Sequence, residues 1–486
     1  MTTKSNRLNI LFIASEADPF VKIGGLGDVA GSLPLAINEL SDGQPRLDIR
    51  LAIPLYGFIN KNYPELKKLA DFKVNTGSLS INAAVFSIIH HGMTVYFISG
   101  DPINENEPVY GTNFNADAEK FIFFSLACLE LPRVLKWKID ILHCNDWHTA
   151  IAIHQLEKLR LSRPGYTKIK SVLTLHNLPF MGSGSEEALT RYGIEPAQDA
   201  SLPVWARTIP LPMGLASADR IVAVSPTYAH EILTPAYGCG LETFFINNQA
   251  RLSGILNGID QSIWDPNTDT LIPQNFNPEN IQKKAANKKA LQKEMGLTIE
   301  STIPLIVIIS RMDPQKGIDL AFEALRKSIK LGWQCIILGS GDPILERAAQ
   351  SLELEFLQSI RTKITFDSAL SHRMYAGADM LLMPSRYEPC GLSQLIAMRY
   401  GTVPVARATG GLKDTITDAT ITKIGNGFLF DEADSTQAAI AITSAVETFH
   451  TKKGWQRIKR NAMRSDFSWA ESAKKYCSLY HDLVSP

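Results

Sequence analysis

Two cations and one carboxylate in the second half of the chain have the residue types that can bind and stabilise a diphosphate. Arg311 and Lys316 lie in SRMDPQKG, directly after a run of apolar residues. Arginine can bind two oxygens at once and lysine acts as a point charge, so the pair suits a diphosphate, although a solvated basic loop is the alternative. Glu388 lies in SRYEPCGL, on a turn that its flanking prolines make stiff. Its carboxylate either faces a ligand or serves as an ion-pair partner.

Two glycine-bearing loops are further candidates for binding an anion. KIGGLGDVAG contains Lys22, Gly24 and Gly25 ahead of a helical stretch, where glycines permit close backbone approach and helix amides can face an anion. The loop matches neither the dinucleotide fingerprint, because SEADPFVKI separates it from the preceding strand, nor the Walker pattern, because its lysine precedes the glycines. A turn with a solvated lysine is the alternative. The second loop consists of Thr409, Gly410, Gly411 and Leu412.

Polar side chains also follow two successive apolar runs in the first half of the chain. Asp146 follows the run in IDILHCNDWH, and His176 follows the run in SVLTLHN. One such residue is usually a cap or a turn residue, whereas two at the same sheet edge favour a functional site.

Short runs rich in Val, Ile and Leu alternate with longer mixed stretches, which is typical of parallel sheets covered by helices on both faces. The runs occupy residues 8–15, 48–54, 93–99, 139–145, 169–176, 219–225, 304–310, 333–339, 378–384 and 401–406. The pattern predicts an α/β protein of two facing, Rossmann-like, doubly wound domains, with a ligand in the cleft between them.

Domain limits are predicted at 1–262 and 263–465, with residues 466–486 forming a C-terminal helix that packs back on the first domain. The stretch between Trp264 and Thr302, rich in Pro, Asn and Asp, is interpreted as a linker followed by a helix.

Composition narrows the class of protein. Lys and Arg number 49, as do Asp and Glu, so the formal net charge of zero gives no indication of a nucleic acid partner. No apolar run approaches a membrane span of about 20 residues. The start MTTKSNRLNI enters the first apolar run at once, so we expect no leader and a cytoplasmic location. The six cysteines show no C-x-x-C pairing, so neither a disulfide framework nor a zinc site is indicated.

Eight stretches in order resemble bacterial glycogen synthases and plant starch synthases, and the resemblance extends from about residue 8 to 480. They are KIGGLGDV, HCNDWHTAI, TLHN, AVSPTYAHEI, GILNGID, SRMDPQKG, LSHRMYAGADMLLMPSRYEPCGL and YGTVPVARATGGLKDT. The resemblance implies the GT-B fold and transfer of glucose from ADP-glucose to the non-reducing 4-hydroxyl of an α-1,4-glucan. It also implies retention at the anomeric carbon, with no metal and no cofactor.

The resemblance also implies a role for individual residues. Arg311 and Lys316 would neutralise the leaving ADP, Asp146 and His176 would line the glucosyl pocket, and Glu388 would face the donor sugar. The implied substrate-binding residues are Lys22, Gly24, Gly25, Asn257, Phe366 near adenine, Cys390, Gly391, Leu392, Thr409, Gly410, Gly411 and Leu412. Retention requires either a carboxylate nucleophile or front-face attack, and we favour the second.

The chain departs from the family pattern at two positions. Ile396 stands where the broader clan often has a second glutamate for the ribose, which synthases commonly lack too. Met213 precedes Gly214 where the family usually has a Phe-Leu-Lys type stretch, so acceptor use is open in the segment 181–216. Three alternatives stay open: a glucosyltransferase that uses UDP-glucose, one that acts on a small acceptor such as fructose or a sugar phosphate, and a non-catalytic glucan-binding homologue. The sequence does not indicate an oligomeric state.

Overall fold

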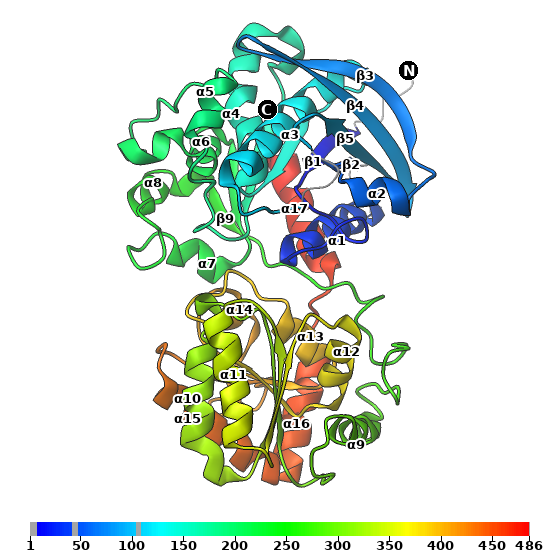
Figure 1. Cartoon of the computed structure of the whole chain (residues 1–486), viewed down its shortest axis with the longest axis vertical. Helices are drawn as coiled ribbons and strands as arrows, with labels where there is room; N and C mark the ends of the chain where they lie inside the picture. Colours follow the sequence, from blue (N-terminus) through cyan, green and yellow to red (C-terminus); the bar gives the residue numbers. More distant parts are fainter. Residues whose placement is uncertain (1–6, 41–46, 104–107, 486) are drawn as a thin grey trace. The chain divides into compact units, whose positions relative to one another are not determined.

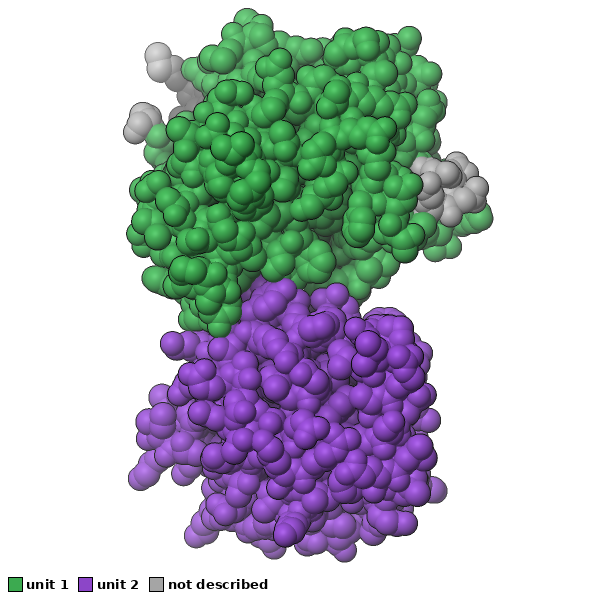
Figure 2. Space-filling view, turned by 60° about the vertical axis from the view of Figure 1, so that its left-hand side comes forward, with its two compact units in different colours: residues 1–258, 469–486 green, residues 259–468 purple. Residues whose placement is uncertain are grey.

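The structure is a computed structural model that describes residues 7–40, 47–103 and 108–485. The chain divides into two units, coloured separately in Figure 2: unit 1 comprises residues 1–258 and 469–486, and unit 2 comprises residues 259–468. Ile259 pairs with Ser468, and its amide donates to the Phe467 carbonyl. The first and last residues of unit 2 are therefore in contact with each other. This pairing explains why the division differs from the expected limits at 262/263 and 465/466.

The described strands of unit 1 form a nine-stranded sheet in the order β3-β4-β5-β2-β1-β6-β7-β8-β9. They are β1 (Leu8–Ile13), β2 (Leu47–Pro54), β3 (Lys67–Thr76), β4 (Leu79–His90), β5 (Met93–Gly100), β6 (Ile141–Asn145), β7 (Lys170–Leu175), β8 (Arg220–Ala223) and β9 (Leu252–Gly254). The β3-β4 and β4-β5 pairs are antiparallel, which corrects the expectation of a purely parallel sheet. The hairpin turns at Gly77, whose φ is +53°.

Helices cover this sheet on both faces (Figure 1). They are α1 (Gly25–Glu39), α2 (Gly57–Asn62), α3 (Phe114–Val134), α4 (Trp147–Ser162), α5 (Glu186–Arg191), α6 (Pro210–Ser217), α7 (Pro226–Glu231), α8 (Glu242–Asn247) and α17 (Trp469–Val484). The last helix, red in Figure 1, lies beside α1, and its Trp469, Tyr476 and Tyr480 join the core of unit 1. Burial of these rings ties the C-terminal end of the chain to its first strands.

The described strands of unit 2 form a six-stranded parallel sheet in the order β12-β11-β10-β13-β14-β15. They are β10 (Leu305–Ile309), β11 (Gln334–Gly339), β12 (Ile360–Ile364), β13 (Met380–Met383), β14 (Val403–Arg407) and β15 (Phe428–Phe430). In β10, Ile306 and Ile308 face one core while Leu305 and Val307 face the other. Burial on both faces explains the continuous apolar runs of these strands.

The helices of unit 2 cover both faces of its sheet. They are α9 (Lys284–Glu294), α10 (Ile318–Ser328), α11 (Pro343–Glu355), α12 (Ser368–Gly377), α13 (Ser393–Arg399), α14 (Gly410–Thr415), α15 (Ser435–His450) and α16 (Lys452–Arg464). Across the described residues, the structure has no helix with the length and apolar character needed to cross a membrane.

The stretch predicted as a linker is part of unit 2. Ile272 and Phe276 are buried in its core, and the buried Asp269 accepts a hydrogen bond from the Tyr400 hydroxyl at 2.6 Å. The Asp269 carboxylate also lies 2.7 Å from the His372 ring. The linker prediction was wrong because a few anchoring side chains can bury a segment whose composition resembles a loop.

The topology places the loops that carry the candidate residues. The chain passes from β1 to β2 on one side and reaches β6 on the other, and β10 likewise lies between β11 and β13. Loops diverge at the carboxyl ends of strands at such switch points, which leaves room for a ligand.

Candidate active site

Lys316 and Glu388 form a short ion pair at the carboxyl edge of the unit 2 sheet. The Lys316 ammonium donates to both carboxylate oxygens of Glu388, with Nζ 2.9 Å from Oε1 and 2.7 Å from Oε2. The Ser385 hydroxyl donates to Oε2 at 3.1 Å. The two side chains are 19% and 5% exposed, so water screens the pair little. Of the two interpretations open for Glu388, the structure shows the ion pair.

Close backbone contacts lock the loops that carry this pair. Gly317 has a φ of +63°, and a Cβ at this position would lie 2.1 Å from the Pro384 carbonyl oxygen. Gly410 has a φ of +44°, and a Cβ there would lie 2.0 Å from the Glu388 carbonyl oxygen. Only glycine fits both positions, so the loops after β10, β13 and β14 pack directly against one another.

Backbone amides of the Thr409–Leu412 loop donate hydrogen bonds within the protein. The Gly411 amide donates to the Glu388 carbonyl at 3.1 Å, and the Leu412 amide donates to the Thr409 carbonyl at 3.0 Å. This loop therefore packs against Glu388 and supports its position. Phosphate binding by its amides stays a prediction.

Arg311 and Phe366 are exposed at the same edge of unit 2. The Arg311 side chain is 59% exposed, and its guanidinium lies 3.3 Å from the Asp313 carboxylate. Phe366 is 86% exposed and follows β12. Both side chains are thus accessible to a ligand at this edge.

Cys390, Gly391 and Leu392 connect Glu388 to α13. The buried Gln394 amide donates to the carbonyl oxygens of Cys390 and Gly391, each at 3.0 Å. Gly391 has a φ of +74°, which favours glycine. This turn fixes the backbone that follows the Glu388 carboxylate.

In unit 1, the Glu16 carboxylate occupies the loop before α1. The amides of Ile23 and Gly24 donate to its Oε2, the second at 3.1 Å, and the Tyr110 hydroxyl donates to its Oε1 at 3.1 Å. Burial raises the pKa of Glu16, although these hydrogen bonds oppose the shift. The loop before Gly25 therefore already holds an anion of the protein.

Lys22 is ion-paired rather than simply solvated. Its ammonium lies 2.5 Å from Asp28 Oδ1 and 3.7 Å from Asp18 Oδ2, and the side chain is 36% exposed. A ligand phosphate would have to compete with two carboxylates for this ammonium.

Asp146 and His176 come together at the ends of β6 and β7. The His176 amide donates to Asp146 Oδ1 at 2.7 Å, and the His176 ring Nε2 lies 2.9 Å from Asn145 Oδ1. The Asn145 side-chain amide donates to the Ile13 carbonyl at 3.0 Å, which assigns its oxygen to the histidine side. Nε2 therefore carries the proton. Nδ1 makes no hydrogen bond to the described residues and can accept one.

Burial sets the charge states of this pair. It lowers the pKa of His176 to about 3, so the ring is neutral near pH 7. Burial raises the pKa of Asp146 to about 7; the His176 and Asn177 amides oppose this shift, and the negative charge of Glu16 adds to it. Asp146 also has φ 53° and ψ −171°, a conformation that costs on the order of 1–3 kcal/mol. Such strain and a perturbed carboxyl pKa together are typical of functional sites.

Asn257 is the last candidate residue of unit 1. It is buried, and its Oδ1 has no hydrogen-bond partner among the described residues. A buried acceptor without a partner is costly, which is consistent with a ligand contact.

Met213 does not take part in such a site. It is fully buried in α6, which packs on α4. A Cβ at the adjoining Gly214 would lie 2.7 Å from Ala150 Cβ. An ammonium at Met213 would have to be buried without a partner, so this side chain is a core residue rather than a contact for the acceptor. Acceptor use by the rest of the segment 181–216 stays open.

Three supporting features were not predicted from the sequence. Glu16 lies in SEADPF, between the first strand and the glycine loop, and its position there was the available signal. Ser385 donates to Glu388. Arg386 donates to both Asp319 oxygens at 2.8 Å and to the Pro314 carbonyl at 2.8 Å, which ties the loop of Glu388 to the loop of Lys316. No sequence pattern indicated these last two.

The two units offer different chemistry. Unit 2 presents cations around a buried carboxylate, which suits stabilisation of a developing negative charge. Unit 1 presents a neutral imidazole and polar groups, which suit sugar hydroxyls. Over the described part of the chain, no group of three or more His, Cys, Asp and Glu residues is arranged to hold a metal ion.

Comparison with known proteins shows to which family the chain is similar. Residues 9–247 match the family described as starch synthase catalytic domain, and residues 292–463 match glycosyl transferases group 1. Glycogen synthase from Clostridium beijerinckii is 39% identical over 98% of this chain and 99% of its own length. Glycogen synthase from Thermodesulfovibrio yellowstonii is 38% identical over 98% of both chains.

Solved structures agree with the sequence matches. The catalytic domain of starch synthase IV from Arabidopsis thaliana, bound to ADP and acarbose, is 33% identical, with a TM-score of 0.89 over 99% of this chain and 100% of that chain. A sucrose-phosphate synthase from Thermosynechococcus elongatus, 17% identical with a TM-score of 0.60 over 98% of this chain and 99% of that one, shares the fold. The fold is the GT-B fold of glycosyltransferases, and the chain belongs to the glycogen synthase and starch synthase family of glucosyltransferases.

Proposed function

We propose that this enzyme transfers glucose from ADP-glucose to the non-reducing 4-hydroxyl of an α-1,4-glucan, with retention at the anomeric carbon. The observation that carries the proposal is the buried Lys316–Glu388 pair at the carboxyl edge of unit 2, in a chain 39% identical to a glycogen synthase. The structural relative bound to ADP and acarbose supports a nucleotide-sugar donor and a glucan acceptor.

In this account, Lys316 and Arg311 stabilise the charge that develops on ADP as its bond to glucose breaks. Cations held in place before the reaction stabilise such charge without reorganisation. Glu388 holds the Lys316 ammonium in position until the donor binds. The diphosphate then competes for the ammonium, and the released carboxylate can accept a hydrogen bond from a sugar hydroxyl.

Unit 1 would hold the glucosyl group with hydrogen bonds. The free Nδ1 of neutral His176 accepts from one hydroxyl, and Asp146 lies beside it. Lys22, Gly24 and Gly25 would contact the sugar and the diphosphate. We favour front-face attack by the acceptor hydroxyl, because Glu388 is ion-paired and has a sugar-binding role in this account.

Phe366, Cys390 to Leu392, Thr409 to Leu412 and Asn257 complete the proposed substrate contacts. We also propose a cytoplasmic location, which the six free thiols support. The proposal includes no metal or cofactor.

The test compares ADP-glucose with UDP-glucose as donor on glycogen, using the purified chain and labelled glucose. We expect faster turnover with ADP-glucose and a product that β-amylase digests. Faster turnover with UDP-glucose would favour the other donor. Binding of maltooligosaccharides without turnover from either donor would indicate a non-catalytic glucan-binding homologue.

A further inference from the structure

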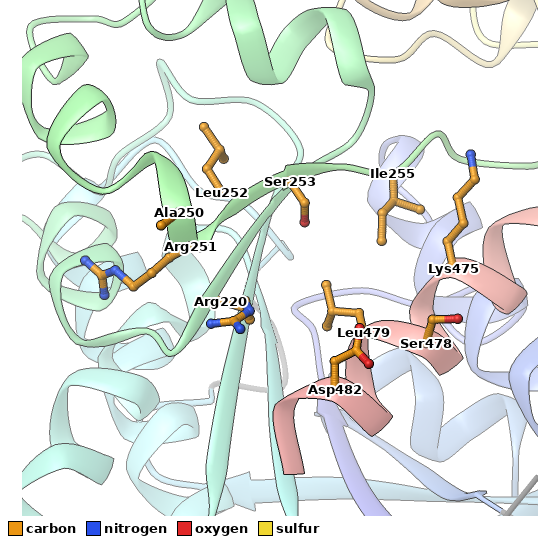
Figure 3. Close-up of a pocket in the computed structure, with 10 residues that line it drawn as sticks. All are labelled: Arg220, Ala250, Arg251, Leu252, Ser253, Ile255, Lys475, Ser478, Leu479 and Asp482. Carbon is orange, nitrogen blue, oxygen red and sulfur yellow. The ribbon is translucent and has the colours of Figure 1, made fainter. Parts of the chain in front are cut away.

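A cavity of about 380 Å³ lies in unit 1 beside β9 and α17 (Figure 3). Arg220 and Lys475 are among its lining residues, and Figure 3 shows the Lys475 side chain extended away from Arg220. These two cations therefore do not converge on one anion. A denser set of polar contacts lies at the carboxyl edge of the same sheet, around the carboxylate of Glu16.

Glu16 is buried three residues after the end of β1, against the loop that precedes α1. The residue is 2% exposed. The amides of Ile23 and Gly24 both donate to its Oε2, the second at 3.1 Å. A buried amide without an acceptor is costly, so this carboxylate fixes the course of the loop backbone.

The first turn of α1 packs on the same carboxylate. A Cβ at Gly27 would lie 3.1 Å from Glu16 Oε2 and 3.2 Å from Lys22 Cα, and a Cβ at Gly24 would lie 3.5 Å from Glu16 Oε1. The Asp18 amide donates to the Gly27 carbonyl at 3.0 Å, which joins the segment after Glu16 to this turn. The carboxylate therefore lies between the loop and the helix.

Tyr110 contacts the other oxygen of the carboxylate. Its hydroxyl donates to Glu16 Oε1 at 3.1 Å and lies 2.8 Å from Ser15 Oγ. The Tyr110 ring packs on the His148 ring, with the centroids 5.1 Å apart. His148 lies two residues after Asp146, and the negative charge of Glu16 contributes to the raised pKa of Asp146. Glu16 therefore connects the glycine loop to the proposed glucosyl pocket.

The outer side of the loop stays accessible to a ligand. Lys22, Ile23 and Gly25 are exposed, whereas Gly24 is half-buried. The Gly25 amide makes no hydrogen bond to the described residues, and Gly25 begins the 15-residue helix α1. An amide at the start of a helix favours an anion, and the Lys22 ammonium belongs to the same loop.

We propose that Glu16 is a positioning residue for the nucleotide-sugar donor. Its carboxylate holds the loop in the conformation in which the Lys22 ammonium and the Gly25 amide contact the donor diphosphate. Glu16 does not contact the substrate itself, and its role depends on the length of its side chain rather than on its charge. This inference rests on the proposed function, in which the loop contacts the sugar and the diphosphate of ADP-glucose.

Glutamine has the length and the hydrogen-bonding groups to replace Glu16. Its Oε1 would accept from the Ile23 and Gly24 amides, and its Nε2 would donate to the Tyr110 hydroxyl. That hydroxyl would then donate to Ser15 Oγ, 2.8 Å away. Aspartate keeps the charge but is one methylene shorter, so it cannot reach both amides and Tyr110 together. The two substitutions therefore separate the length of the side chain from its charge.

Steady-state kinetics of Glu16→Gln, Glu16→Asp and Glu16→Ala with ADP-glucose and glycogen test the proposal. Glu16→Asp and Glu16→Ala should lower kcat/KM for the donor by about 10²-fold, because displacement of a binding group by about 1 Å can cause such a loss. Glu16→Gln should stay within about threefold of wild type, because its hydrogen bonds are complete. Glu39→Gln, at the exposed end of the same helix, is the matched control and should leave the donor kcat/KM unchanged.

Two further measurements distinguish positioning from a general loss of structure. Hydrogen exchange of the peptide that contains Ile23 and Gly24 should be faster in Glu16→Asp than in wild type, and unchanged in Glu16→Gln. Lys22→Ala should also lower the donor kcat/KM. Its combination with Glu16→Asp should lose less than the product of the two single losses, because both residues act through the same loop.

Failure of the proposed function would appear in the wild-type chain itself, as absence of glucose transfer from ADP-glucose. With an active wild-type chain, the inference would be overturned by a Glu16→Asp variant with the wild-type donor kcat/KM or with unchanged exchange of the loop. A Glu16→Gln variant as impaired as Glu16→Ala, or a double variant in which the two losses multiply, would also overturn it. Thermal melts check the fold, and Glu16→Asp carries the test if Glu16→Ala does not fold.

Discussion

The Lys316 ammonium lies 2.7 Å from a Glu388 carboxylate that is 5% exposed, so each charge depends on the other for compensation. Lys316→Ala would leave the Glu388 carboxylate buried and unpaired, and we expect it to lower the free energy of unfolding by about 3 kcal/mol. Lys316→Ala combined with Glu388→Gln should recover most of this loss, since it removes the buried charge. Urea unfolding of both variants measures the difference. A double variant no more stable than the single one would show that the pair is not coupled.

Gly410→Ala should disturb the active site through the backbone. Its Cβ would lie 2.0 Å from the Glu388 carbonyl oxygen, so the Glu388 loop must move. Displacement by about 1 Å can cost about 10²-fold in turnover, which is the expected loss. Gly454→Ala in α16 is the control, because its nearest contact is 3.6 Å away and turnover should not change. Equal turnover of Gly410→Ala and wild type would contradict the proposed locking of these loops.

Asp146→Asn should change how stability depends on pH. The folded-state pKa of Asp146, raised to about 7, means that the folded state binds this proton more tightly than the unfolded chain does. The stability it contributes is present at low pH and is lost as pH rises through about 7. Asn cannot titrate, so the free energy of unfolding of the variant, relative to wild type, should rise by about 2–3 kcal/mol from pH 5 to pH 8. Urea unfolding at intervening pH values measures this, and a constant difference would disprove the shift.

Much of the fold could be predicted because buried parallel strands are continuous apolar runs. All ten predicted strands are present as β1, β2, β5, β6, β7, β8, β10, β11, β13 and β14. The missed β3 has exposed polar residues along most of its length, and the missed β12 reads IRTKI. Neither carries the apolar run that indicates a buried strand, since an edge strand need not be buried on both faces.

The sequence predicted those site residues that follow an apolar run or lie in a glycine-bearing loop. Lys316 and Glu388 lie in neighbouring loops because β10 and β13 are adjacent in the sheet. The sequence pattern predicts the strands but not their order in the sheet. The position of Glu16 between the first strand and the glycine loop was a signal that the residue lies near the site, but its contacts could not be predicted, because they depend on the turn between the strand and the helix. The fully buried state of Met213 likewise depends on how α6 packs on α4.

Met213→Lys tests that last point. It would place an ammonium in a fully buried position, so we expect destabilisation of about 3 kcal/mol or more and no lower Michaelis constant for maltooligosaccharides. Met213→Leu conserves volume and should cost less than about 1.5 kcal/mol. Thermal melts and acceptor kinetics measure both effects. A stable Met213→Lys variant with improved acceptor use would restore the acceptor interpretation of this segment.

The most direct test of the proposed role of Lys316 is the steady-state kinetics of Lys316→Ala on glycogen with ADP-glucose. A thermal melt checks that the variant is folded. The exposed Lys330→Ala of the same unit is the control and should leave turnover unchanged. If Lys316 stabilises the departing ADP, turnover should fall by about 10²- to 10³-fold, or about 3–4 kcal/mol. Donor binding should weaken less, because the additional charge appears only as the bond breaks. A folded Lys316→Ala variant with turnover close to wild type would contradict the account.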